Sequence, residues 1–261
     1  MSKVIILGSG AAPGVPALAN GFGACDANNP KNYRMRTGTY MELSGVKFLI
    51  DTSPDLRWQL IKNNIKTLDA VFYTHSHADH LHGIDDLREI NRLSGQMLDI
   101  YGTKNMIQTI CTRFPYLICQ DEKNLNPIFK AALRPHVVEY EMSFMIEQLK
   151  VTPIEMIGHN IESTGYIFND GEVVHIADFK SLDERVFKYI KRQPEVLIMP
   201  LTTPLGTRFH AGLDELKYYA AKINPKRMVI NHMAVECDYE AVKRQCLSNM
   251  CPTYDGETIE W

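Results

Sequence analysis

One short segment constrains this chain more than any other, because it places four histidines and an aspartate within ten residues. The segment is THSHADHLHG, residues 74–83, and it directly follows the apolar run 68–73. Neutral imidazole suits Zn, Fe, Ni or Cu, and a carboxylate adds a harder ligand. So many ligands of this kind beside a strand predict a transition-metal site, and their number favours two ions over one.

The spacing within this segment separates the ligands into two sets. If residues 69–73 form a strand, His75 and His77 point to the same side and can hold one metal. Asp79 and His80 follow in a turn or the first turn of a helix, so they suit a second metal, and two-metal hydrolytic centres place their ions roughly 3.5–4 Å apart. The helical H-E-x-x-H pattern is absent, and the lack of a paired C-x-x-C argues against a zinc ribbon or finger.

Composition excludes several other classes. The 261 residues suffice for one large domain or two small ones, and a net charge of −3 gives no support for a general nucleic-acid surface. The N-terminal apolar run is too short for a signal peptide, and no stretch approaches the length of a membrane span. The six cysteines show no framework spacing. We therefore expect a cytoplasmic protein with reduced thiols and no membrane contact.

Periodicity and turn residues predict a single domain, residues 1–261, with a mostly helical insertion at about residues 103–135. A strand-rich first half and a second half that alternates strand and helix favour two packed sheets with helices outside. Gly8–Gly14 is not a dinucleotide-binding loop, because its third glycine is one place late and the prolines are incompatible with the helix whose N-terminus would bind the pyrophosphate. The predicted strands are 4–7, 39–42, 46–50, 69–73, 99–101, 144–152, 165–168, 172–177, 196–199 and 227–230. The predicted helices are 56–62, 85–93, one capped by Ser181 or Asp183 that runs to about 192, 213–222 and 239–247.

Three isolated residues are predicted to complete the metal site. His159 follows the apolar stretch 151–157, Asp178 ends another, and His232 ends a third. Strands that each run into one coordinating side chain bring distant ligands to the same rim of a sheet.

The other histidines test this reasoning. His175 lies an odd number of residues before Asp178, so on an extended strand it faces the opposite side, and we interpret it as packed or at the surface. His136 has no nearby partner in the sequence, so we expect it to face solvent. His82 is expected at the rim of the site, with a supporting role as the alternative.

This pattern resembles the metallo-β-lactamase superfamily. The resemblance rests on H-x-H-x-D-H at residues 75–80, on the later histidines and aspartate, and on Asp51 at an earlier strand end. It implies an α/β fold, the αββα sandwich of two mixed β-sheets flanked by helices, with the site along one edge. The implied ligands are His75, His77 and His159 for one metal, Asp79, His80 and His232 for the other, and Asp178 as the bridge.

The resemblance also implies supporting residues. Asp51 is expected to hold a metal-bound imidazole through its other nitrogen. Asp85 and Arg88 are expected to support the ligands, with an ion pair on a helix face as the alternative. His210, just before a predicted helix, is the candidate for phosphate contact or leaving-group protonation, because an ordinary histidine pKa suits acid–base work. A capping or surface histidine is the alternative for His210.

Within the superfamily, the segments 32–36, 51–57 and 83–88 resemble the cyclic-phosphate phosphodiesterases of phosphonate breakdown, the PhnP-like branch. Members of that branch often carry a cysteine cluster for a structural zinc near residues 21–28, where this chain keeps only Cys25. We therefore expect two divalent ions and no structural third zinc. Zinc is the default metal, and mixed nitrogen and oxygen ligands also admit manganese or iron.

The implied function is a dinuclear metal-dependent phosphodiesterase acting on a small nucleotide-like or ribosyl (cyclic) phosphate ester. Two ions lower the pKa of a bridging water towards about 7, so that hydroxide can attack phosphorus in a centre to which Asp79 contributes. The net positive centre favours a small anionic substrate. Alternatives are a thioester or lactone hydrolase, a tRNA 3′-processing endonuclease and a non-catalytic binding module. Nucleic acid is not an expected partner, because no basic or glycine-rich arm is present, and a homodimer is left open.

Overall fold

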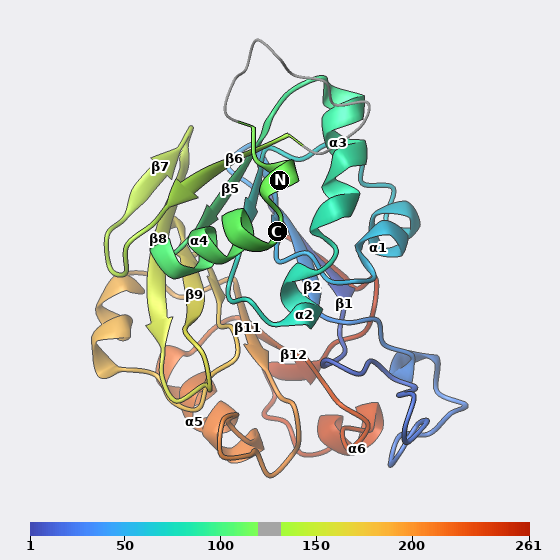
Figure 1. Ribbon diagram of the computed structural model, residues 1–261. Coiled ribbons are helices and arrows are strands. Elements are labelled where there is room, and N and C mark those ends of the chain that lie inside the picture. The colour runs from blue at the N-terminus through green and yellow to red at the C-terminus, as the bar shows by residue number, and fades with distance from the viewer. Residues whose placement is uncertain (120–131) are drawn as a thin grey trace.

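Two seven-stranded β-sheets pack face to face in the computed structural model (Figure 1). The structure describes residues 1–119 and 132–261. In spatial order, the first sheet contains β14 (Thr258–Glu260), β1 (Lys3–Gly8), β2 (Gly38–Leu43), β3 (Val46–Ile50), β4 (Ala70–Phe72), β5 (Leu98–Gly102) and β6 (Leu133–Val137). The second contains β13 (Met250–Pro252), β12 (Arg227–Asn231), β11 (Val196–Pro200), β10 (Val173–His175), β9 (Ser163–Phe168), β8 (Leu149–Met156) and β7 (Phe144–Ile146).

Both sheets are mixed in the same way. In the first, β14, β1, β2 and β3 pair antiparallel, and β3 to β6 pair parallel. In the second, β7 to β10 pair antiparallel, and β10 to β13 pair parallel. Parallel strands need crossover connections, and these connections carry the helices. The expected αββα sandwich is therefore confirmed.

Helices cover the outer face of each sheet (Figure 1). The first sheet is covered by α1 (Leu56–Lys62), α3 (Leu87–Ser94) and α4 (Lys104–Arg113), and the second by the 3₁₀ helix η6 (Glu184–Tyr189), α5 (Leu213–Ile223) and α6 (Tyr239–Lys243). The shorter helical turns are η1 (Pro30–Asn32), α2 (Ala78–Leu81), η2 (Ile84–Asp86), η3 (Pro115–Leu117) and η5 (Asn169–Gly171).

The alternation of side chains along β1 shows why these strands are apolar on both faces. Val4 and Ile6 belong to the core between the sheets, whereas Ile5 and Leu7 pack against the helices on the outer face. A strand buried on both faces gives a continuous apolar run instead of an alternating one. Aromatic rings fill the middle of the inter-sheet core, where the ring centroids of Phe48 and Phe168 lie 4.9 Å apart.

Two predicted elements differ from the structure. The strand predicted over residues 144–152 is a hairpin of β7 and β8, in which Phe144 pairs with Val151. Its turn contains no glycine or proline, and Glu147 takes a left-handed φ of 50°, so the sequence carried no turn signal. The helix predicted to run to about residue 192 is the 3₁₀ helix η6, and Asp183 caps it by accepting from the backbone NH of Arg185.

The predicted helical insertion at 103–135 is correct only in part. The helix α4 and the turn η3 lie within it, but residues 133–135 belong to the strand β6. The part of the prediction that falls on residues 120–131 lies outside the described residues. In the two described stretches, 1–119 and 132–261, no helix is both long enough and apolar enough to cross a membrane.

The parallel arrangement positions the candidate site. The strands β3 and β4 are parallel neighbours in one sheet, and β10, β11 and β12 are parallel neighbours in the other. The carboxyl ends of parallel neighbours meet at one edge of a sheet, where α/β proteins place their ligands. Because Asp51, His75, Asp178 and His232 follow four of these ends, one edge of the sandwich collects them.

Candidate metal centre

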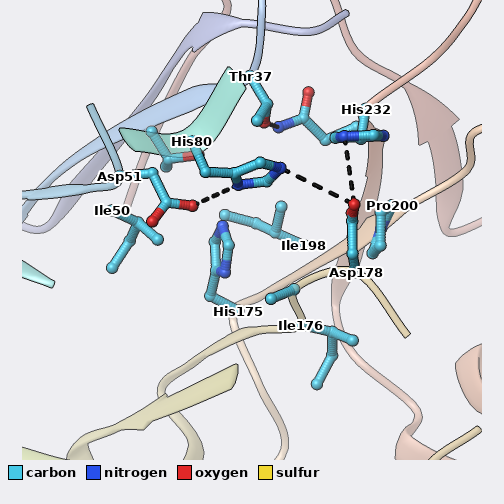
Figure 2. Close-up of a pocket in the computed structure, with 13 residues that line it drawn as sticks. Thr37, Ile50, Asp51, His80, His175, Ile176, Asp178, Ile198, Pro200 and His232 are labelled. Carbon is cyan, nitrogen blue, oxygen red and sulfur yellow. Dashed lines mark hydrogen bonds and ion pairs between the residues drawn. The ribbon is translucent and has the colours of Figure 1, made fainter. Parts of the chain in front are cut away.

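The carboxylate of Asp51 contacts the histidine segment at two positions, Thr74 and His80. One of its oxygens accepts from the backbone NH of Thr74 at 2.8 Å, and the other accepts from the Thr74 hydroxyl at 2.7 Å. The second oxygen also lies 2.6 Å from His80 Nδ1 (Figure 2). The Nδ1–H therefore donates to Asp51, and Nε2 of His80 is directed towards the other ligands. The sequence implied such a contact for Asp51, and the binding of a metal by this imidazole stays a prediction.

The first set of predicted ligands comes together around His77. His75 Nε2 lies 3.1 Å from His77 Nδ1, and His159 Nε2 lies 3.3 Å from the same atom. The Thr74 hydroxyl contacts Nδ1 of His75 at 2.9 Å, which leaves its Nε2 for the site. His75 is buried, whereas His77 and His159 are half-buried. One face of this group is therefore open to a substrate.

The second set is fully buried and centres on Asp79. Its Oδ2 lies 3.3 Å from His232 Nε2 and 3.5 Å from His80 Nε2. The other nitrogen of His232 contacts the hydroxyl of Thr202 at 3.2 Å. Sequence reasoning missed Thr202 and Thr74, since a threonine beside a ligand carries no distinguishing pattern.

Asp178 lies between the two sets. Its Oδ2 is 3.4 Å from His232 Nε2, 3.8 Å from His80 Nε2 and 4.0 Å from His75 Nε2 (Figure 2). His210 approaches the same oxygen, with its Nδ1 at 3.9 Å and its ring centroid 5.1 Å from that of His159. Asp178 thus lies within 4.0 Å of nitrogens from both sets, with His210 at its side, and its bridging role stays a prediction.

The donor set fits a pair of divalent ions. Four groups have ligand atoms within 4.8 Å of one another, and they are His75–His77–His159, His75–His80–Asp178, Asp79–His80–His232 and His159–Asp178–His210. Among the described residues, the buried atoms His80 Nε2 and His210 Nδ1 have no hydrogen-bond partner. Imidazole nitrogens and carboxylate oxygens that converge without partners of their own are the ligands a borderline cation requires.

Burial and the neighbouring carboxylates shift the histidine pKa values in opposite directions. Desolvation lowers the pKa of His75 well below its ordinary value and that of His159 to about 4. Desolvation acts in the same sense on His80, but the carboxylates of Asp79 and Asp51 outweigh it and raise its pKa to about 9. Without a cation, His80 therefore holds a proton at neutral pH.

The carboxylates and His232 show the reciprocal effect. Burial would raise the pKa of Asp79 and Asp178, but the nearby histidines hold both values below the ordinary range. Burial opposes charge on His232, yet Asp178 and then Asp79 raise its pKa. The site therefore contains ionised carboxylates that need positive charge beside them.

Two predicted supporting residues lie elsewhere. Asp85 is exposed and its carboxylate accepts from the Tyr116 hydroxyl at 2.8 Å. Arg88 is exposed on α3, and its Nε lies 3.9 Å from Glu89. The turn η2 and the helix α3 direct both side chains to solvent. The expected contact with the metal ligands is therefore wrong, and the alternative, an Asp85–Arg88 ion pair, is wrong as well, because the two residues contact Tyr116 and Glu89 instead.

The remaining histidines also have definite environments. His82 is exposed beside Phe114, and its position at the rim of the site stays a prediction. His136 is not without a partner, because its Nε2 lies 2.9 Å from Asp99 and its ring stacks on Tyr101. His175 is buried, but it does not face away from Asp178 as expected. The strand β10 ends at His175, so the alternation no longer applies beyond it, and both residues line one cavity.

Cys25 lies away from this centre, next to a buried arginine. Its sulfur is 3.8 Å from Nη1 of Arg34, which is 3% exposed. Arg34 donates to the carbonyl oxygens of Ala234 at 3.3 Å and Cys237 at 2.7 Å, and so ties the N-terminal loop to the segment after His232. Among the residues that the structure describes, Cys25 belongs to none of the possible metal groups. The absence of a structural third zinc stays a prediction.

Known proteins resemble this chain in sequence and fold. A family model described as "Beta-lactamase superfamily domain" matches residues 47–233. An octanoyltransferase of Porphyromonas gingivalis is 30% identical over 190 residues, which cover 72% of this chain and 37% of that protein. A ribonuclease Z of Clostridium perfringens is 28% identical over 152 residues, which cover 54% of this chain and 47% of the relative. The chain thus spans less than half the length of either curated relative.

A solved structure extends the likeness to the whole chain. It is described as a new diphosphatase from the PhnP family and superposes with a TM-score of 0.87 at 27% sequence identity. The match covers 100% of this chain and 98% of that one.

The position of Asp178 generates the first prediction. We expect zinc-loaded protein to hold two ions per chain, and Asp178→Ala to hold one or none, because its carboxylate faces both ligand sets. Metal content should be measured by mass spectrometry after gel filtration, with circular dichroism to verify folding. Asp214→Ala is the matched control, since its side chain is 94% exposed. Two ions in folded Asp178→Ala would contradict the bridging position.

The raised pKa of His80 predicts a pH-dependent metal affinity. A metal needs a free Nε2, so below a pKa of about 9 one proton must leave His80 on binding. Zinc affinity should therefore rise with pH, by about tenfold per unit for each released proton, between pH 6.5 and 8.5. Chelator competition at three pH values measures this slope. Asp51→Asn should flatten it, and an affinity independent of pH would refute the prediction.

Proposed function

The chain belongs to the metallo-β-lactamase superfamily and is a hydrolase of that superfamily, and we propose that it acts as a dinuclear metal-dependent phosphodiesterase. The proposed substrate is a small nucleotide-like or ribosyl phosphate ester, including cyclic esters. The observation that carries the proposal is the position of the Asp178 carboxylate, within 4.0 Å of nitrogens from both ligand sets. The full-length likeness to a PhnP-family diphosphatase supports the phosphate class.

The charge of the site favours an anionic substrate. Two divalent ions would act there as Lewis acids that activate water and offset charge on a phosphoryl group. The residues that would hold them contribute only two carboxylates, Asp79 and Asp178, against four positive charges. The surplus of positive charge would be most accessible from the half-buried side formed by His77 and His159, where a phosphate ester could approach.

His210 is the group best placed to contact the substrate. It lies beside Asp178 and His159, and its side chain is 20% exposed, so it borders both the ligands and solvent. Burial lowers its pKa, which makes the ring neutral at pH 7. A neutral ring can donate one N–H bond to a phosphoryl oxygen but has no surplus proton for a leaving group. We therefore infer phosphate contact for His210.

Two relatives with the same fold suggest rival substrates for comparison. The ribonuclease Z relative makes a tRNA precursor one comparison, although the net charge of −3 does not suit a polyanionic chain. The octanoyltransferase relative makes an octanoyl thioester the other comparison. Each relative is matched over less than half of its length, so these activities are arms of the experiment and not conclusions.

A panel of substrates tests the proposed class. Zinc- and manganese-loaded protein should hydrolyse bis(p-nitrophenyl) phosphate and a nucleoside cyclic phosphate. We expect kcat/KM for these esters to exceed that for an octanoyl thioester by at least about a hundredfold, a difference of roughly 2.7 kcal/mol in transition-state stabilisation. Asp178→Ala is the inactive control. A preference for the thioester, or for a tRNA precursor over both small esters, would reject the proposal.

His210→Ala tests the phosphate contact. We expect kcat/KM to fall by about 10²–10³-fold while two metals remain bound, because one hydrogen bond to the reacting group is lost. The loss should be equal for a p-nitrophenyl ester and for an ester with a poor alkyl leaving group. A much larger loss on the alkyl ester would instead assign leaving-group protonation, and unchanged activity would remove His210 from the site.

A further inference from the structure

The loop that carries His210 meets the chain that follows Asp178. This loop, residues 201–212, connects β11 to α5. The backbone NH of Ala211 donates to the carbonyl oxygen of Phe179 at 2.9 Å. The residue after His210 is therefore hydrogen-bonded to the residue after Asp178.

One lysine makes a second contact between the same two stretches. Nζ of Lys180 donates to the carbonyl oxygen of His210 at 3.3 Å and to Oε1 of Glu215 at 3.1 Å. Glu215 lies in the first turn of α5, and its other carboxylate oxygen accepts from the backbone NH of Gly212 at 3.1 Å. The ammonium group thus joins the backbone of His210 to the start of the helix that follows it.

The stem of the same lysine packs against the loop that carries His159. Gly158 has a left-handed φ of 81°, and a Cβ at this glycine would lie 2.7 Å from Cβ of Lys180, inside the normal contact distance of two carbon atoms. The backbone NH of Lys180 also donates to the carbonyl oxygen of Ile157 at 2.8 Å. One residue therefore contacts both the chain before His159 and the backbone of His210.

The other contacts of the His210 backbone lie within its own loop. The NH of Thr207 donates to the His210 carbonyl oxygen at 2.9 Å, and the Thr207 hydroxyl accepts from the NH of His210 at 3.1 Å. These bonds shape the loop without fixing it relative to the predicted ligands. The bond from Ala211 to Phe179 does so through backbone atoms, so the Lys180 contact is the link that a side-chain substitution can test.

The exposure of the Lys180–Glu215 pair argues against a mainly stabilising role. The two side chains are 35% and 43% exposed, and water screens ion pairs of this kind so that they add little to stability. By contrast, a displacement of about 1 Å in a group that contacts the substrate can lower a rate by about 10²-fold. The position of His210 is therefore the property that this lysine influences most.

We propose that Lys180 is a positioning residue for His210. Its ammonium group holds the His210 carbonyl, which keeps the imidazole Nδ1 3.9 Å from Oδ2 of Asp178 and the ring centroid 5.1 Å from that of His159. Glu215 orients the ammonium group from the other side. The consequence for catalysis rests on the proposed function, in which His210 contacts the substrate, whereas the consequence for geometry does not.

Lys180→Met tests the geometry, because it removes the ammonium group and keeps an unbranched stem against Gly158. Crystal structures of the zinc-loaded full chain should show the His210 ring displaced by more than about 1 Å or without ordered density, while the zinc content stays that of the wild type. Lys150→Met is the matched control. Lys150 pairs with Asp170 at 2.8 Å with side chains 31% and 38% exposed, near the start of β8, whose other end leads to His159. An ordered, unmoved His210 ring in Lys180→Met would overturn the proposal.

A double-mutant cycle then tests whether Lys180 acts through His210. On the phosphodiester that the wild type hydrolyses fastest, we expect Lys180→Met to lower kcat/KM about tenfold, and to have no further effect beside His210→Ala. Lys180→Arg keeps a cation within reach of both acceptors and should restore most of the activity, and Lys150→Met should match the wild type. Equal losses with and without His210 would refute a role through this histidine.

The two measurements separate this proposal from the proposed function. A wild-type protein that hydrolyses no phosphodiester would reject the proposed function, and the crystal structures would still decide whether Lys180 sets the position of His210.

Discussion

The contact of the Asp51 carboxylate with the histidine segment is the interaction on which the centre depends. The backbone around Asp51 is itself fixed, since its NH donates to Phe72 on the neighbouring strand and the NH of Thr52 donates to the carbonyl of His80. Asp51 keeps a left-handed φ of 64°, a conformation that costs about 1 kcal/mol or more and persists where surrounding contacts impose it. This rigid corner orients Thr74 and His80, and through Thr74 it orients His75.

The same corner brings histidines and carboxylates together in a buried volume, where like charges repel and each group loses contact with water. Several imidazoles and two carboxylates share a buried volume, and their pKa values spread to both sides of the ordinary range. A pair of divalent cations would resolve this conflict by neutralising the carboxylates and taking the free nitrogens. The two sheets supply the stability that holds such an arrangement, because their apolar layers are buried on both faces. The buried charges of the site thus lie at one edge of a well-packed sandwich.

The N-terminal loop is held against the segment after His232 by one buried arginine. Here the buried guanidinium of Arg34 takes backbone carbonyls as its partners and holds the segment that follows His232. The sulfur of Cys25 packs against the same group. A cation built into the chain therefore joins two loops that pass beside the ligands.

Local order in the sequence determined the central part of this site. His75, His77, Asp79 and His80 are close in space because they are close in sequence, and apolar runs that end in His159, Asp178 or His232 indicated strand ends. The tertiary structure alone decided the surroundings. Because β10 ends at His175, this residue and Asp178 line the same cavity. The directions of η2 and α3 leave the side chains of Asp85 and Arg88 in solvent. The cavity lined by Thr39, His175 and Asn231 together with three of the predicted ligands exists only where the two sheets meet. Spacing along a chain fixes which side chains share a face, but only packing between distant strands decides what that face meets.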